Sequence, residues 1–131
     1  MNPTSPLIER GRTGRIVYAR VAPNEDLVRS IEALCAAHGL AHAFVRGGLG
    51  SLIDACLQRR EGDPQHIAGP AVEIVSFGGE VRAQADGAPR AALSGVVADP
   101  QGQMHGGLFV AGRNPICMTL EVTLEEWLPQ G

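Results

Sequence analysis

The sequence predicts a single α+β domain in which one main amphipathic helix covers a twisted, mostly antiparallel sheet. Two patterns point to this fold class. One segment, residues 24–38, has apolar residues at helical spacing. About seven other segments are rich in β-branched residues and are separated by turn signals, as is typical of strands joined by hairpins. The 131 residues, 44% of them hydrophobic, suit one domain with its own core.

The chain starts with a stretch that contains two prolines and has no apolar period. We therefore expect residues 1–9 to form a flexible tail and residues 10–131 to form the domain. The sequence RIVYARVA at 15–22 predicts the first strand, because it combines β-branched and aromatic residues.

The helix is expected over residues 24–38. Asn24 is a favourable N-cap, and Gly39 supplies the usual stop after the last turn. The apolar residues at helical spacing are Leu27, Val28, Ile31, Leu34 and Cys35. This stripe needs a sheet to pack against.

Four further strands are expected between the helix and the turn at Asp99. Segments 41–50 and 52–60 read as two strands joined at a glycine-rich corner. A loop rich in glycine and proline then leads to strand 71–81, and an Asp-Gly turn leads to strand 91–98.

The final part of the chain predicts a hairpin and a closing strand. Asp99 to Gly102 fit a β-turn, so strand 91–98 should pair antiparallel with the strand that carries His105. The closing strand alternates regularly from residue 116 to residue 125. Its predicted core face consists of Ile116, Met118, Leu120, Val122 and Leu124.

The net charge and the hydropathy of the chain limit the kinds of partner that we expect for it. The formal net charge is -3, and all 11 basic residues are arginines, so non-specific DNA binding would need a local basic patch. The candidate patch is RGRTGR at 10–15. No window approaches the roughly 18 apolar residues of a membrane helix, and the start lacks the pattern of a signal peptide. We expect a cytoplasmic protein with no membrane partner.

The three cysteines, Cys35, Cys56 and Cys117, lie far apart among apolar neighbours, which favours packed free thiols over a disulfide or a zinc knuckle. Because one helix cannot cover so many strands, we also expect self-association to protect the remaining sheet faces or edges.

The order of these pieces resembles a known family. The segments RIVYARVAPNEDLVRSIEALCAAHGL, GGLGSLIDACL, GPAVEIVSFGGEV, DPQGQMHGGLFVAG and TLEVTL together are similar to the PPC domain, also called PCC, of plants and prokaryotes. The similarity covers residues 15–125, and GPAVEIVSFGG and the GGL after the turn are its most specific parts. Bacterial members of this family are often labelled DNA-binding proteins.

The resemblance implies a homotrimer of α+β domains, and it implies histidines that hold a metal such as zinc in many members. Those positions fall on Ala92, Ser94 and Leu108 here, which lack suitable ligand atoms. His105 precedes the last position by three residues, and an odd offset on a strand turns a side chain to the opposite face unless a bulge intervenes. We therefore expect no metal site and no cofactor.

The residues leave two interpretations of the candidate site open. His105 is either a binding or acid-base residue in a cleft between subunits or a strand-end histidine without chemical function. We hypothesise that Arg46 and Glu73, with Asp54 or Arg113, line a polar inter-subunit pocket together with His105. The alternative for the first two is a structural Arg-Glu salt bridge.

Two functions follow. The first is a non-enzymatic binding module, a homotrimer that recognises DNA, another protein or a small molecule. The second is a small cytoplasmic enzyme or ligand sensor that uses the cleft around His105. For DNA, the RGRT sequence at 10–13 resembles an AT-hook core, but Thr13 replaces its proline, and a solvated lead-in to the first strand explains the segment as well.

Overall fold

The computed structural model describes residues 6–130 and contains one helix and a sheet of eight strands. The elements are β1 (Gly11–Val21), α1 (Leu27–His38), β2 (His42–Leu52), β3 (Ala55–Gln58), β4 (Gln65–Ile67), β5 (Val72–Ala83), β6 (Pro89–Ala98), β7 (Met104–Phe109) and β8 (Ile116–Pro129). The strand order is β1-β8-β2-β5-β6-β7-β3-β4, and neighbouring strands are antiparallel. The predicted α+β fold class is confirmed.

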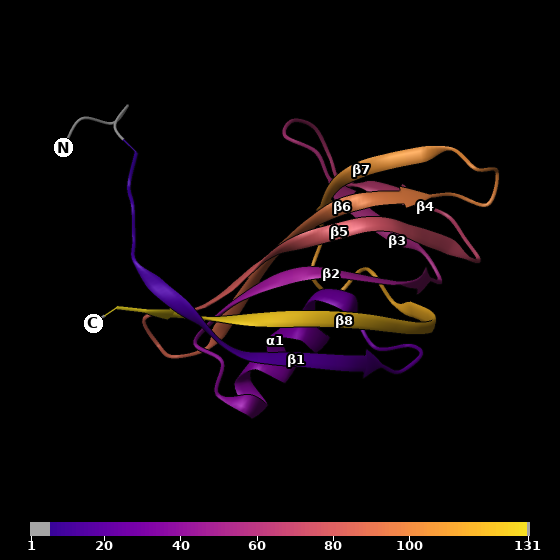
Figure 1. The fold of residues 1–131 in the computed structure, drawn as a ribbon. Helices are drawn as coiled ribbons and strands as arrows, with labels where there is room; N and C mark the ends of the chain where they lie inside the picture. Colours follow the sequence, from indigo (N-terminus) through magenta and orange to yellow (C-terminus); the bar gives the residue numbers. More distant parts are fainter. Residues whose placement is uncertain (1–5, 131) are drawn as a thin grey trace.

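The core lies between α1 and the inner face of the sheet. Figure 1 shows α1 passing behind β1, β8 and β2, while β3 and β4 lie behind β5 and β6, so the sheet curls around the core. The helix contributes Leu27, Val28, Ile31 and Cys35, which are at most 2% exposed. We call the face of the sheet turned away from α1 the outer face.

The helix begins later than the sequence indicated, and its cap is a different residue. Asp26, and not Asn24, is the N-cap, because its carboxylate accepts a hydrogen bond from the Arg29 amide at 3.0 Å. The other carboxylate oxygen accepts from the Asn114 amide at 2.9 Å, so the same side chain ties the helix start to the segment before β8. The predicted end at Gly39 is confirmed, with φ 64°.

Several strand boundaries also differ. β1 begins at Gly11, four residues earlier than expected, because residues 11–13 pair with the end of β8. β2 continues through the glycine corner to Leu52, and β4 lies inside the predicted loop. Of the predicted tail, residues 1–5 lie outside the described residues and residues 6–10 have no regular structure, so its boundary with the domain stays a prediction.

The closing strand is interrupted by an irregularity that its alternating pattern does not show. Ile116 pairs with Leu52 and Leu120 with Gly50, so four steps on β8 match two steps on β2. Met118 lies within this irregularity and is 72% exposed, so its predicted place in the core is wrong. The other four residues predicted for the core face are buried.

Cys35 and Cys56 are buried, Cys117 is partly buried, and all three are free thiols. Within residues 6–130, no helix is long and apolar enough to cross a membrane.

Candidate functional site: the His105 turn and the outer sheet face

His105 lies near the start of β7, opposite the buried Val97 of β6. Its Nε2 is 2.8 Å from Oδ2 of Asp99, and its Nδ1 is 3.4 Å from Nε2 of Gln65 on β4. The side chains of His105 and Asp99 are only 16% and 10% exposed. Both ring nitrogens are therefore engaged with the protein's own groups.

Asp99 also organises the turn before β7. The Gly102 amide donates to the Asp99 carbonyl at 2.8 Å, as in the predicted β-turn, and Gly102 has φ 84°. One carboxylate oxygen of Asp99 accepts from the amides of Gln101 and Gln103, each at 2.9 Å. The hydrogen bond from His105, followed by that from the Gln103 amide, lowers the pKa of Asp99. The arrangement thus holds a turn together.

The pairing of His105 with Asp99 was not predicted from the sequence. The signal was present, because Asp99 opens the β-turn and a hairpin brings residues on either side of its turn together. The contact favours the interpretation of His105 as a strand-end histidine.

The positions where family resemblance implies metal ligands do lie together. Ser94 pairs with Leu108, and Ala92 lies two residues from Ser94 on the same outer face. The ladder between β6 and β7 has no register shift between Met104 and Leu108, so His105 faces the opposite side, as expected. Alanine and leucine offer no lone pair and serine is a poor ligand, so these residues do not fit a zinc ion. Within residues 6–130, no three His, Cys, Asp or Glu side chains gather as a metal site requires.

Arg46 has Glu125 and not Glu73 as its ion-pair partner. Its Nε lies 3.1 Å from Oε2 of Glu125 on β8. Glu73 is exposed on β5, opposite Ser51, and forms no ion pair within the described part of the chain. The alternative of an Arg46-Glu73 salt bridge is therefore wrong within one subunit, because five positions of β2 separate Arg46 from the partner of Glu73.

The remaining candidates lie elsewhere. Asp54 accepts a hydrogen bond from the Gly69 amide at 2.9 Å and lies 3.7 Å from Nε2 of His66. Arg113 is exposed after a turn in which its amide donates to the Val110 carbonyl at 3.2 Å. One subunit does not bring the five candidates together, and the predicted pocket between subunits stays a prediction.

The outer face carries exposed apolar side chains. Leu49 pairs with Glu121 between the buried Leu120 and Val122, and it is 60% exposed. On β7, Met104 and Leu108 are 62% and 45% exposed. The other large exposed apolar side chains on strands are Ile16, Tyr18, Val75 and Met118.

A hollow of about 430 Å³ lies on the outer face over β1, β8 and β2, with Tyr18, Arg46, Leu49 and Glu121 among its lining residues. Glu121 accepts hydrogen bonds from the Tyr18 hydroxyl at 2.9 Å and from Arg20 at 3.1 Å. These bonds, that from Tyr18 first, lower the pKa of Glu121. The two charged groups that line this hollow thus each have a partner beside it, Glu125 for Arg46 and Arg20 for Glu121.

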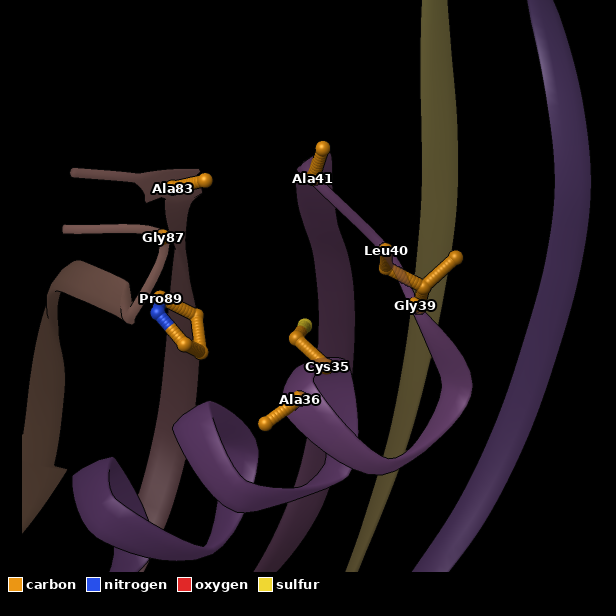
Figure 2. A pocket seen from close by; sticks show the side chains of 8 residues that line it. All are labelled: Cys35, Ala36, Gly39, Leu40, Ala41, Ala83, Gly87 and Pro89. Atoms are coloured by element: carbon orange, nitrogen blue, oxygen red, sulfur yellow. The ribbon is translucent and has the colours of Figure 1, made fainter. Parts of the chain in front are cut away.

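A smaller pocket of about 160 Å³ lies where the end of α1 meets the β5-β6 hairpin. Figure 2 shows the Cys35 side chain among Ala36, Leu40 and Pro89 there. Burial, and next the nearby Glu32, raise the pKa of Cys35 to about 11. The thiol therefore stays protonated at neutral pH and is a poor nucleophile.

The basic segment at 10–15 belongs to the sheet. Gly11, Arg12 and Thr13 pair with residues 127–129 of β8. Arg15 forms an ion pair with the buried Glu126 at 2.9 Å and donates to the carbonyls of His38 and Gly39 at the end of α1. The segment is thus the beginning of the first strand and does not lead into it as a free arm.

Comparison with known proteins gives one family. The model of the Plants and Prokaryotes Conserved (PCC) domain matches residues 8–128. No curated protein matches the chain.

Solved structures share the fold. A PPC protein from Pyrococcus horikoshii aligns with a TM-score of 0.79 and 23% identity over 96% of this chain and 86% of its own. A metal-containing protein from Archaeoglobus fulgidus aligns with a TM-score of 0.80 and 19% identity over 96% and 89%. A "Putative DNA-binding protein" from Ralstonia eutropha JMP134 aligns with a TM-score of 0.71 and 19% identity over 86% and 78%. At these identities, the likeness shows the fold alone.

Proposed function

This chain belongs to the Plants and Prokaryotes Conserved (PCC) domain family, and on that premise we propose that it is a non-enzymatic module that assembles as a homotrimer and binds another protein. The family resemblance drawn from the sequence is confirmed by the match over residues 8–128. Family membership leaves the function open, because one fold supports many functions. The proposal therefore rests on the surface of this chain.

The observation that carries the proposal is the apolar outer face. Leu49, Met104 and Leu108 are at least 45% exposed on the side of the sheet that α1 leaves uncovered. Burial of such surface contributes about 25 cal/mol per Å² of apolar area. A closed threefold assembly can cover these three side chains on every subunit, because each subunit contributes the same surfaces.

The contacts of His105 support a non-enzymatic role. Its two ring nitrogens face Asp99 and Gln65. The contact with Asp99 holds the β6-β7 turn, and the contact with Gln65 links β7 to β4. Ala92, Ser94 and Leu108 offer a metal no ligand set. The alternative of an enzyme or sensor would need a second subunit to complete a cleft beside His105.

Sedimentation equilibrium tests the assembly. We expect a mass about three times the chain mass of 13.8 kDa for the unmodified protein. The double variant Leu49→Asp/Leu108→Asp should sediment as a monomer, because it places two charges on the apolar face. Leu7→Asp is the matched control, because Leu7 is 79% exposed outside the sheet and should leave the mass unchanged. An unmodified protein that stays monomeric at high concentration would contradict the proposal.

DNA is a second candidate ligand, favoured by Arg10 and Arg12, which are exposed and form no ion pair within residues 6–130. Band shifts at several salt concentrations test it, with and without A-T tracts in the duplex. DNA binding through these arginines should weaken steeply as salt rises. The absence of a shift at low salt would end this candidate.

A further inference from the structure

We propose that the free edge of β1 is a docking site at which an extended, acidic segment of a partner protein adds a strand to the sheet. This inference rests on the proposed function as a protein-binding module, and it names the surface and the chemistry of the partner. Strand addition uses the unpaired N-H and C=O groups of an edge strand for affinity, and nearby side chains select the partner.

β1 is a long open edge. It stands at the end of the sheet order, and within residues 6–130 the strand paired with it is β8. Residues Ile16–Val21 stay in unbroken register with residues 120–125, after the irregularity between Thr13 and Ile16. The opposite edge strand, β4, has three residues, which is too short to dock a segment of similar length. Figure 1 shows β1 and β4 at well-separated places in the sheet.

Apolar surface lies directly beside this edge. Ile16 and Tyr18 are 69% and 61% exposed. Both point to the outer face, because their partners Glu125 and Thr123 alternate with buried residues of β8. The Tyr18 hydroxyl is held by Glu121, which leaves the ring free for contact with side chains of an added strand.

The charge along the edge specifies an acidic partner. Residues 10–20 contain four arginines and no aspartate or glutamate. Arg15 and Arg20 have glutamate partners on β8, whereas Arg10 and Arg12 are exposed and have no ion-pair partner among residues 6–130. Carboxylates on an added strand can pair with these two guanidinium groups.

The same charges disfavour a second copy at this edge. Antiparallel pairing of β1 with β1 of another subunit would bring arginines of both strands together, and like charges on adjacent strands are destabilising. Minor-groove DNA binding is also disfavoured, because Gly11, Arg12 and Thr13 are held in the ladder with β8.

Fluorescence anisotropy tests the proposal with a labelled decapeptide of alternating valine and glutamate, added to the full-length protein. We expect saturable binding and at least tenfold weaker binding of the matching valine-lysine decapeptide. The variant Arg10→Glu/Arg12→Glu should weaken binding of the glutamate peptide at least tenfold. The control Arg59→Glu/Arg60→Glu changes the net charge equally at two exposed residues beyond β3 and should weaken it less than threefold.

Hydrogen exchange measured by NMR distinguishes strand addition at β1 from binding by charge attraction alone. Every second amide of an edge strand faces its free side, so the peptide should slow the exchange of alternate amides within Ile16–Val21. No binding at 1 mM peptide, equal weakening by both charge variants, or an unchanged exchange pattern would each overturn the proposal. So would a shift of duplex DNA that Arg10→Glu/Arg12→Glu abolishes while the peptide does not bind.

The two proposals can fail separately. A monomeric protein that binds the peptide at β1 would overturn the trimer and leave the docking edge in place. A trimeric protein that does not bind the peptide would overturn only the proposal of docking at β1.

Discussion

Nε2 of His105 lies 2.8 Å from a carboxylate oxygen of Asp99, and this contact fastens the start of β7 to the turn that precedes it. The pKa of Asp99 is lowered, mainly by His105. A carboxylate with a lowered pKa adds stability above its ordinary pKa, and that stability is lost as the pH falls through the lowered value. The pair therefore supports the turn at neutral pH and weakens in acid.

We predict that His105→Ala loosens this turn without unfolding the protein. Without the imidazole, Asp99 keeps only its bonds to the turn amides, so the amides of Gln101 and Gln103 should exchange at least tenfold faster. NMR hydrogen exchange measures this. The β5-β6 turn at residues 84–88 is the internal control, because its Gln84 and Asp86 bonds do not involve His105. Unchanged exchange at Gln101 would contradict the prediction.

The ion pair between Arg15 and Glu126 should make stability depend on acid. Glu126 accepts from the Arg15 side chain and from its amide, and these bonds, the side-chain bond first, lower the pKa of Glu126 to about 2. Its contribution is complete above the ordinary glutamate pKa of about 4.3 and is lost as the pH falls toward 2.

Glu126→Gln should therefore lower the free energy of unfolding at pH 7 by about 1.5–3 kcal/mol, as for other hydrogen bonds to charged groups. Urea unfolding at several pH values measures this. The difference between the unmodified protein and the variant should shrink from pH 5 to pH 2. A difference that stays constant over this range would show that the charge of Glu126 contributes nothing.

Asn114 is predicted to be the most sensitive polar residue of the core. It is fully buried, its Oδ1 accepts from the Cys56 amide at 2.9 Å, and its Nδ2 donates to the carbonyls of Cys56 and Val110. Asn114→Ala removes all three hydrogen bonds. The carbonyls of Cys56 and Val110 keep the Val110 and Arg113 amides as donors, but the Cys56 amide loses its acceptor, so the variant should cost about 2–4 kcal/mol in urea unfolding. Gln101→Ala, at an exposed turn position, should change stability by less than about 0.5 kcal/mol.

Two glycines on neighbouring strands should respond differently to alanine. A Cβ at Gly48 would lie 2.3 Å from the Glu121 carbonyl oxygen and 2.5 Å from the Phe77 ring, whereas at Gly78 the nearest atom would be the Val45 carbonyl oxygen at 3.4 Å. Gly48→Ala should therefore lose about 1–3 kcal/mol through overpacking. Gly78→Ala is the matched control, and its free energy of unfolding should fall clearly less. Thermal unfolding of both variants measures the two losses.

Thiol titration tests the packing of the cysteines. Cys35 is 1% exposed with a pKa of about 11, Cys56 is 0% exposed, and Cys117 is partly buried. Because the thiolate is the reactive form, at most one thiol per chain should react with a disulfide reagent at pH 8, and all three should react in denaturant. Cys117→Ser should remove the fast reaction. Rapid reaction of two thiols in the folded protein would contradict this packing.

Local patterns predicted the elements well, since the signals for a helix, a strand or a tight turn lie within a few residues of one another. The helix stop at Gly39 and the Asp99 turn are examples. The cap at Asp26 was missed because Asn24 is an equally good N-cap by residue type, and the contact of Asp26 with Asn114 lies 88 positions away along the chain.

The sequence by itself determined the fold class, the family and the lack of ligand atoms at Ala92, Ser94 and Leu108, because each of these depends on residue types and their spacing. The tertiary structure decided which residues meet. Arg46 pairs with Glu125 and Arg15 with Glu126, across strands that are far apart in sequence. It also decided that Met118 leaves the core and that β1 stands at an open edge. These outcomes depend on strand order and register, which the packing of the whole sheet around one core selects.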